Sequence, residues 1–322
     1  MSAGATTIVL LSVDEAALLE RSLPAAVAQP NADVLVVDNA CTDATAEVAA
    51  RHGARRLGLE RRVSYAAAVN AGVAAAEGDS VLLLNADCVL DPGFLAAARG
   101  ALRDPRIGSV APKLIRASGM GAAERLSVVD AAGMVVDRRR KNALVGHNEP
   151  GDRYSVPAPA FGGDGAAVLY RREALDDCAV DGAVLDEDFE LWAADVDLAW
   201  RARVLGWECR YEPRAIAWHV RFYSPSTRAR LDAAHRRLQF RNRYLMIAKN
   251  DTGAALARDL HVVAAYELLA LGYALAVERE LLRGYLEALR LLPAAVRRRR
   301  AIMRRRRQRG TGRVPLGLTP PA

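Results

Sequence analysis

The chain has 322 residues, of which 52% are hydrophobic and 26% charged, a composition that excludes disordered and fibrous proteins and fits one large domain with an appendage. The formal net charge is +7. Nine arginines between residues 297 and 309 contribute nine positive charges, so the rest of the chain carries a net charge of −2. A near-neutral body argues against a nucleic-acid-binding groove, and we expect no nucleic-acid partner.

The cysteines and the N-terminal residues both favour a cytoplasmic protein. No basic segment precedes the short apolar run at residues 8–11, so we expect no signal peptide. The cysteines form no CxxC pair, which favours reduced thiols over disulfides and over structural zinc. They are Cys41, Cys88, Cys178 and Cys209.

The N-terminal part of the chain alternates strand and helix signals. Apolar runs of the kind found in buried parallel strands occur at residues 7–11, 34–37 and 81–84, and helical spacing occurs at residues 15–27, 44–52 and 65–77. This order predicts an α/β fold with a doubly wound sheet and right-handed crossovers. Ligands of such sheets bind outside the carboxyl ends of the strands.

Polar residues follow each of the three apolar runs. They are Ser12 and Asp14, then Asp38 and Asn39, then Asn85 and Asp87. Any one of them is typical of a turn or a helix cap, but their recurrence at equivalent strand ends predicts a ligand site. The chain has neither GxGxxG nor GxxxxGK[ST], which argues against a dinucleotide site of the Rossmann type and against a P-loop.

The second half is less regular and then becomes helical. Residues 116–159 predict a hairpin and a loop, the pattern is helical from residue 251, and the Gly/Pro-rich tail from residue 310 is predicted to be disordered. The apolar stretch at residues 262–277 contains Glu267 and is shorter than the ~18 to 20 residues that a spanning helix needs. We therefore predict a buried or interfacial helix there.

Five blocks of the sequence resemble one family. Asn85-Ala86-Asp87 is similar to the DxD-type motif of family-2 glycosyltransferases with the GT-A fold, and the other blocks resemble further motifs of that family. They are VVDNACTD at 36–43, AVNAG at 68–72, LDEDF at 185–189 with DVDLAWRAR at 195–203, and Trp218-His219. The block at 185–203 resembles the rhamnosyltransferase-like branch. The resemblance covers residues 5–220 and implies a nucleotide-sugar donor, a divalent metal, inversion at the anomeric carbon, and a lipid-linked or polysaccharide acceptor.

We predict three regions on this basis. Residues 1–222 form a GT-A nucleotide-sugar transferase domain with a doubly wound mixed sheet, residues 223–309 form a helical, basic and membrane-associated region, and residues 310–322 form the tail.

The resemblance implies a metal site built from Asp87 and His219. A hard divalent cation, Mg²⁺ or Mn²⁺, would stabilise the charge that develops on a leaving diphosphate, and His219 would supply a neutral nitrogen ligand. Many relatives carry an acid where this chain has Asn85, whose amide would bind the ribose or a metal-bound water. The alternative is a turn in which Asn85 and Asp87 cap the next helix.

Asp195 is the candidate catalytic base. Inversion in one displacement requires a group that takes a proton from the acceptor hydroxyl, and Asp195 begins a helix-like segment whose dipole favours the ionised carboxylate. Asp197 lies about 200° further round that helix and is predicted to form an i,i+4 ion pair with Arg201. The family usually has a glutamate before the base, whereas this chain has Ala194.

The remaining implied contacts concern the nucleotide and the sugars. Asp38 would accept a hydrogen bond from N3 of uracil or thymine, with Ser12 alongside and Asn70 near the ribose or diphosphate, which favours a UDP- or dTDP-sugar. Donor sugar and acceptor are expected near a second group of residues. This group comprises Gly162, Gly163, Asp164 and Trp192.

The C-terminal region predicts amphipathic helices that end in the arginine tract at residues 297–309. Each basic residue near an anionic membrane surface contributes ~1 kcal/mol, so this tract would hold the protein at the inner face of the cell membrane. The alternatives are a homo-oligomer interface and a solvated tail.

The sequence as a whole predicts an inverting, metal-dependent transferase that moves a rhamnose-like sugar or another hexose in cell-envelope glycan synthesis. Asn85 and Ala194 motivate an alternative, a non-catalytic paralogue that binds a nucleotide-sugar or a glycan at the membrane. A scaffold that uses only its C-terminal helices would bind no nucleotide.

Overall fold

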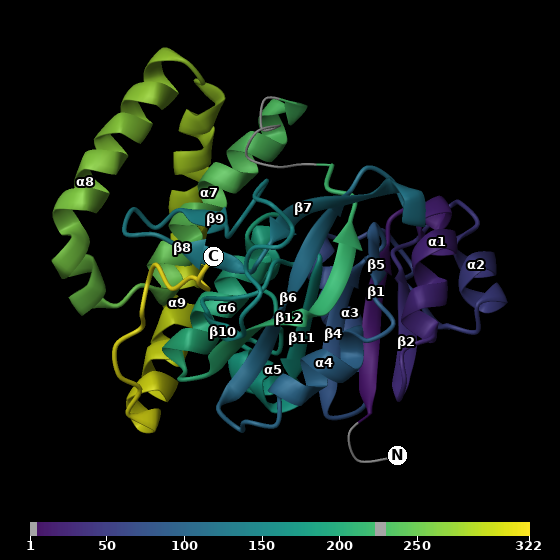
Figure 1. Cartoon of the computed structure of the whole chain (residues 1–322). Helices are drawn as coiled ribbons and strands as arrows, with labels where there is room; N and C mark the ends of the chain where they lie inside the picture. Colours follow the sequence, from purple (N-terminus) through teal and green to yellow (C-terminus); the bar gives the residue numbers. More distant parts are fainter. Residues whose placement is uncertain (1–4, 223–229) are drawn as a thin grey trace.

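The computed structural model describes residues 5–222 and 230–322, and its centre is a ten-stranded mixed sheet (Figure 1). The strand order is β10-β12-β6-β11-β4-β1-β2-β3, with β5 paired to β12 and β7 paired to β6. The strands of this sheet are β1 (Thr6–Ser12), β2 (Ala32–Asp38), β3 (Arg55–Gly58), β4 (Ser80–Asn85), β5 (Cys88–Leu90), β6 (Ile107–Ala117), β7 (Arg125–Ala131), β10 (Ala158–Ala160), β11 (Ala167–Arg171) and β12 (Glu208–His219). A separate hairpin pairs β8 (Met134–Val136) with β9 (Asn142–Leu144).

The predicted parallel strands β1, β2 and β4 are confirmed, because their apolar runs are buried on both faces of the sheet. Ile8 and Leu10 pack on one face, against α1 (Ala16–Val27), α2 (Thr45–Arg51) and α4 (Phe94–Ala101). Val9 and Leu11 pack on the other face, against α3 (Tyr65–Ala75), α5 (Arg172–Cys178) and α6 (Ala194–Val204).

The sequence did not predict the edge strand β3. Its four residues, RRLG, are largely exposed and lack the apolar run that identifies the inner strands. Helix α3 lies directly on the sheet at Gly72, where an added Cβ would come within 2.5 Å of a Val9 methyl carbon. That contact gives the glycine of the AVNAG block a packing role.

Strand β12, which lies near one edge of the sheet, brings distant parts of the chain together. It pairs parallel with β6 and antiparallel with β5, and in that register His219 lies opposite Cys88. The β4–β5 turn, which carries Asp87, is therefore held beside the end of β12.

Three long helices follow, namely α7 (Ala233–Asn250), α8 (Gly253–Ala276) and α9 (Glu280–Arg309) (Figure 1). Side chains of α7 and α9, among them Met246 and Ile302, are fully buried in the same core cluster as the sheet. The helical region therefore shares the core of the α/β domain. The predicted boundary between residues 222 and 223 lies at the start of residues 223–229, which are outside the described residues.

Parts of both the arginine tract and the tail contact the domain. Arg298 pairs with Asp186 and Asp188, and Arg305 donates to the backbone oxygens of residues 177 and 179, so part of the tract binds α9 to the domain. The tail was predicted to be disordered, but Val314 is buried and the N–H of Gly317 donates to the Val136 carbonyl at 2.8 Å.

Within the described residues, α8 is the single helix whose length and apolar composition would suffice to cross a membrane. It has 24 residues and is longer than the apolar stretch at 262–277. The length argument made from that stretch was therefore wrong.

Candidate active site

The two predicted metal ligands lie together at the edge formed by the β4–β5 turn and the end of β12. Nε2 of His219 lies 3.4 Å from Oδ1 of Asp87. That oxygen is buried and, among the described residues, has no hydrogen-bond partner of good geometry. Two ligands of one small divalent ion, each at about 2.1 Å and at right angles, are about 3 Å apart, so this pair fits one coordination sphere.

Asp130 on β7 fixes the orientation of the histidine ring. Its Oδ2 accepts a hydrogen bond from His219 Nδ1 at 2.8 Å, which leaves Nε2 facing Asp87. A carboxylate behind a histidine ligand is the usual means of orienting it toward a metal. Burial opposes charge on the ring, but the two carboxylates outweigh burial and raise the pKa of His219 to about 9, so a metal would displace a proton from Nε2.

Arg221 connects this pair to the next part of the site. Its guanidinium donates to both oxygens of Asp130 and to Oδ2 of Asp164, at 2.7 to 3.0 Å. Burial disfavours an ionised Asp130, yet His219 and Arg221 outweigh burial and hold the pKa of this carboxyl well below its usual range. Neither Asp130 nor Arg221 was predicted.

The Gly162-Gly163-Asp164 segment packs closely against neighbouring elements. A Cβ on Gly162 would lie 2.5 Å from the Cβ of Ala199 on α6, and one on Gly163 would lie 2.8 Å from a Val168 methyl carbon. These glycines therefore let the backbone pack closely against the protein itself. Oδ1 of Asp164 accepts from the N–H of Ala166 at 3.0 Å.

Asp195 lies in the first turn of α6, as predicted. Its Oδ2 accepts from the N–H of Gly165 at 3.0 Å, which places it next to Asp164. Burial first, and the charge of Asp164 second, raise the pKa of Asp195 to about 6. The helix N-terminus was expected to favour the ionised form, but burial and the neighbouring carboxylate outweigh that effect.

The loop before Asp195 is held by α7. The amide of Asn242, which is fully buried, donates to the carbonyls of Phe189 and Trp192, each at 2.7 Å. Glu190 and Ala193 have positive φ values of 60° and 63°, a backbone conformation that needs such support. Trp192 itself lies edge-on to His235, with ring centroids 6.2 Å apart.

The predicted ion pair between Asp197 and Arg201 is confirmed at 2.8 Å and is completely buried. Lys249 of α7 joins it and bridges Asp197 at 2.8 Å to Asp186 of the LDEDF block. Asn250 donates a further hydrogen bond to Asp197 at 2.6 Å. These contacts give Asp197 a structural role.

The nucleotide side lies at the ends of β1 and β2. Ser12 and Asp38 are register partners, and both are buried. Oδ1 of Asp38 accepts from the N–H of Cys41 at 2.8 Å and Oδ2 accepts from Arg56 at 2.7 Å. Burial opposes ionisation of Asp38, but these donors lower its pKa and keep it an acceptor.

Two other predicted residues are engaged within the protein. The Asn70 amide donates to the Leu185 carbonyl at 2.9 Å and accepts from the Leu185 N–H at 2.8 Å, so it joins α3 to the LDEDF block. The N–H of Asn85 donates to the Ala166 carbonyl at 2.9 Å. Their contacts with a nucleotide-sugar remain predictions.

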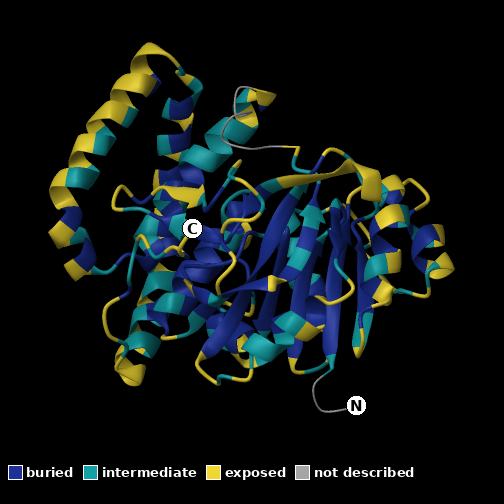
Figure 2. Cartoon of the chain, viewed as in Figure 1, coloured by how far each residue is buried: buried dark blue, intermediate teal, exposed yellow. Residues whose placement is uncertain are grey.

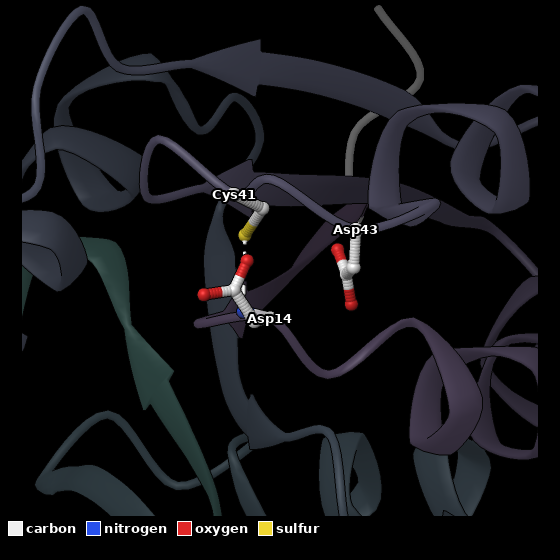
Figure 3. A group of neighbouring side chains, drawn as sticks. All are labelled: Asp14, Cys41 and Asp43. Carbon is white, nitrogen blue, oxygen red and sulfur yellow. Dashed lines mark hydrogen bonds between the residues drawn. The ribbon is translucent and has the colours of Figure 1, made fainter.

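Asp14, Cys41 and Asp43 form a second cluster of candidate metal ligands (Figure 3). Their oxygens already bind protein donors. Asp14 accepts from the Thr42 N–H at 2.7 Å and from Arg62, which together lower its pKa to about 2. Asp43 accepts from the Ala16 N–H at 2.7 Å, at the start of α1. The cluster thus closes a loop and caps a helix.

Comparisons with known proteins identify the family of the chain. The family model described as Glycosyl transferase family 2 matches residues 7–178, more than half of the chain. The chain belongs to this family. The match covers the family as a whole and does not show that the chain belongs to the rhamnosyltransferase-like branch.

Two curated relatives illustrate the range of the family. An uncharacterized glycosyltransferase of Mycobacterium tuberculosis is 46% identical over 97 residues, which are 30% of this chain and 42% of that protein. The poly-beta-1,6-N-acetyl-D-glucosamine synthase of Staphylococcus epidermidis is 22% identical over 198 residues, 59% of this chain and 43% of the synthase. The chain spans less than half the length of these relatives.

Solved structures share the GT-A fold. GalNAc-T7 with UDP, GalNAc and Mn²⁺ superposes with a TM-score of 0.60 at 13% identity, over 77% of this chain and 48% of that one. The mannosyltransferase PcManGT of Pyrobaculum calidifontis, in complex with GDP-Man and Mn²⁺, superposes with a TM-score of 0.55 at 18% identity, over 96% and 88% of the two chains.

Proposed function

We propose that this protein is an inverting, metal-dependent glycosyltransferase in which Asp87 and His219 hold the metal and Asp195 is the base. The observation that carries the proposal is a continuous path of contacts between the two parts of the site. From Asp87 it passes through His219, Asp130, Arg221 and Asp164 to Gly165, whose N–H binds Asp195.

The chemistry divides between the two ends of this path. A divalent Mg²⁺ or Mn²⁺ ion held by Asp87 and His219 would supply positive charge for the leaving nucleoside diphosphate. Asp130 holds the His219 ring so that Nε2 faces Asp87. Asp195, with a pKa of about 6, is ionised at neutral pH and takes the proton of the acceptor hydroxyl as that oxygen attacks the anomeric carbon.

The donor is proposed to be a UDP- or dTDP-sugar. Asp38 lies at the end of β2 as an ionised acceptor, which suits N3–H of uracil or thymine and suits adenine poorly. The structural neighbours were determined with UDP in one case and GDP-Man in the other, so the preference rests on Asp38 and not on the fold.

The acceptor is proposed to be lipid-linked or a polysaccharide of the cell envelope, and the protein to act in the cytoplasm at the inner face of the membrane. The name of the Staphylococcus epidermidis relative, a polysaccharide synthase, supports this acceptor class. The tract retains exposed arginines, including Arg300, Arg304 and Arg307, that support a contact with anionic lipid.

Asp195→Asn tests the assignment of the base. Wild-type protein is first screened against a panel of nucleotide-sugars with Mn²⁺ or Mg²⁺ by thermal shift, where a hundredfold excess over Kd adds about 2.7 kcal/mol of stability. We expect Asp195→Asn to keep this shift and lose transfer to acceptor, while Asp176→Asn, an exposed control on α5, keeps both. Near-normal turnover of Asp195→Asn would contradict the role of this residue.

The same assay separates an enzyme from a binding protein. Wild-type protein that binds donor but never releases UDP or dTDP in the presence of acceptor would favour the non-catalytic alternative. Loss of the metal-dependent shift in His219→Ala is expected if the metal lies beside Asp87.

A further inference from the structure

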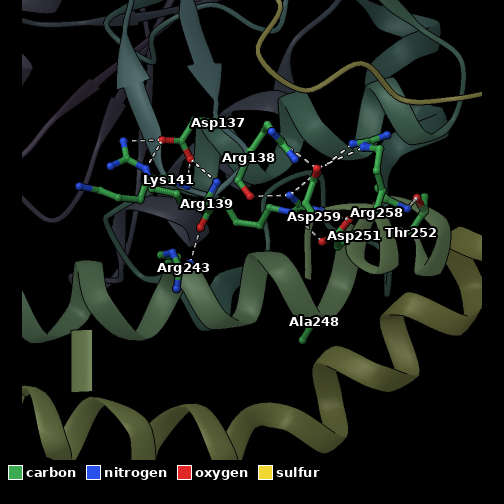
Figure 4. A network of polar contacts seen from close by, with 12 residues as sticks. Asp137, Arg138, Arg139, Lys141, Arg243, Ala248, Asp251, Thr252, Arg258 and Asp259 are labelled. Atoms are coloured by element: carbon green, nitrogen blue, oxygen red, sulfur yellow. Dashed lines mark hydrogen bonds and ion pairs between the residues drawn. The ribbon is translucent and has the colours of Figure 1, made fainter. Parts of the chain in front are cut away.

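Helix α8 directs its two carboxylates, Asp259 and Glu267, toward the protein. Asp259 is fully buried and accepts hydrogen bonds from Arg138 and Arg140, which belong to the β8–β9 turn (Figure 4). About two helical turns further along α8, Glu267 accepts hydrogen bonds from Arg243 and Tyr244 of α7, each at 2.6 Å. These contacts fix which side of α8 faces the domain.

The opposite side of α8 is apolar and exposed to solvent (Figure 2). Leu268 and Leu269 are each 73% exposed, and Leu275 is 52% exposed. Between residues 260 and 277 the chain contains a single Asp, Glu, Lys or Arg, the inward Glu267. A surface helix of a water-soluble protein shows the reverse arrangement, with its polar face outward.

Exposed arginines occur at the two ends of this apolar surface and on helix α9. Arg258 and Arg279 lie at those two ends. On α9, the exposed Arg290, Arg300, Arg304 and Arg307 share one side of the helix by their spacing, and they form no ion pair within residues 5–222 and 230–322.

We propose that the outer face of α8, residues 257–277, lies in the interfacial layer of an anionic bilayer, with the exposed arginines of α9 on the lipid headgroups. An apolar helix face bordered by arginines is the arrangement that binds such interfaces. The polar face of α8 stays bound to Arg140 and Arg243, so the helix lies on the bilayer and does not span it. Contact between two copies through the same face would instead bring like-charged arginines together.

This inference rests on the proposed membrane location of the protein. It adds the outer face of α8 to the arginine tract as a surface that contacts the membrane. The test is sedimentation of the full chain with phosphatidylcholine vesicles that contain phosphatidylglycerol. We expect Leu268→Gln/Leu275→Gln to reduce the partition coefficient at least ~10-fold, equivalent to ~1.4 kcal/mol. Both leucines are exposed and one heptad apart on α8, so the fold tolerates the change.

The matched control is Val27→Gln/Val156→Gln, which alters two valines exposed by 41% and 57% on other parts of the surface. It should bind vesicles as the wild type does. Arg300→Gln/Arg304→Gln should lower binding to anionic vesicles at low salt and change little at high salt.

Two results would overturn the inference. One is an unchanged partition of the leucine variant. The other is a wild-type dimer in light scattering that the leucine substitutions convert to a monomer without loss of vesicle binding, because the face would then join two copies. Vesicle binding by a protein that shows no thermal shift with any nucleotide-sugar would sustain the inference while contradicting the proposed function.

Discussion

The donor side and the base side of the site are built in different ways. Ser12 and Asp38 lie at the ends of adjacent strands, and their partners, such as Thr45 and Cys41, are no more than 33 residues away in the chain. The loop that leads to Asp195 depends on Asn242 and Lys249 of α7, which are 50 or more residues away. The Ser12–Asp38 part of the donor side is therefore a local product of the βαβ segment, whereas the base side requires the C-terminal helices.

The largest expected effect is on the buried network behind the base. Asp197→Ala removes the carboxylate that Arg201 and Lys249 share. It leaves Arg201 buried without its carboxylate partner and Lys249 with Asp186 alone. We expect a loss of about 3 to 5 kcal/mol in the free energy of unfolding, measured by urea titration. Arg55→Ala, which removes the exposed pair with Asp33 on the donor side, should cost no more than about 1 kcal/mol.

Asn242→Ala is expected to separate the two sides functionally. It removes the two hydrogen bonds that hold the carbonyls of Phe189 and Trp192, so the loop before Asp195 shifts. Misplacing a reacting group by about 1 Å slows a reaction by up to about 100-fold. We therefore expect kcat to fall by up to this factor, while the Kd of the nucleotide-sugar stays unchanged. Transfer kinetics and donor titration measure the two quantities. A parallel rise in the donor Kd would show that the sides are coupled.

The pH dependence of transfer should report the base side alone. With a pKa of about 6, Asp195 is a carboxylate above that pH and is increasingly protonated below it, so kcat should fall about tenfold per pH unit under pH 6. Asp164→Asn removes the nearby charge that helps to raise this pKa, and the acidic limb should move to lower pH. Asp176→Asn, remote on α5, should leave the profile in place. An acidic limb that Asp164→Asn does not move would contradict this electrostatic coupling.

Much of the donor side was predictable because its signals are local. The apolar runs identify β1, β2 and β4 as buried strands, and polar residues at their ends follow directly. The Asp197–Arg201 pair follows from helical spacing alone. The pairing of Asp87 with His219 was implied by the family resemblance, since no local pattern joins residues so far apart.

The remaining features depend on long-range contacts that leave no local pattern. Asp130 and Arg221 are separated by 91 residues, and no sequence pattern around either one distinguishes it from other charged residues. The contacts of Arg298 with the domain were not predicted, because its partners, among them Asp186, precede it by more than a hundred residues. Strand β3 was missed because an exposed edge strand needs no apolar run.

The smallest expected effect is on the donor side. Asp38→Asn keeps an oxygen that can accept from N3–H of the base but removes its charge, so binding of UDP or dTDP should weaken by about tenfold, or 1.4 kcal/mol. Calorimetric titration in the presence of Mn²⁺ measures this change, with Asp33→Asn on the exposed end of β2 as the control. Because the base side is held independently by α7, the acidic limb of the pH profile at saturating donor should stay at about pH 6. A shift of that limb in Asp38→Asn would mean that the nucleotide side sets the ionisation of Asp195, contrary to the separate construction of the two sides.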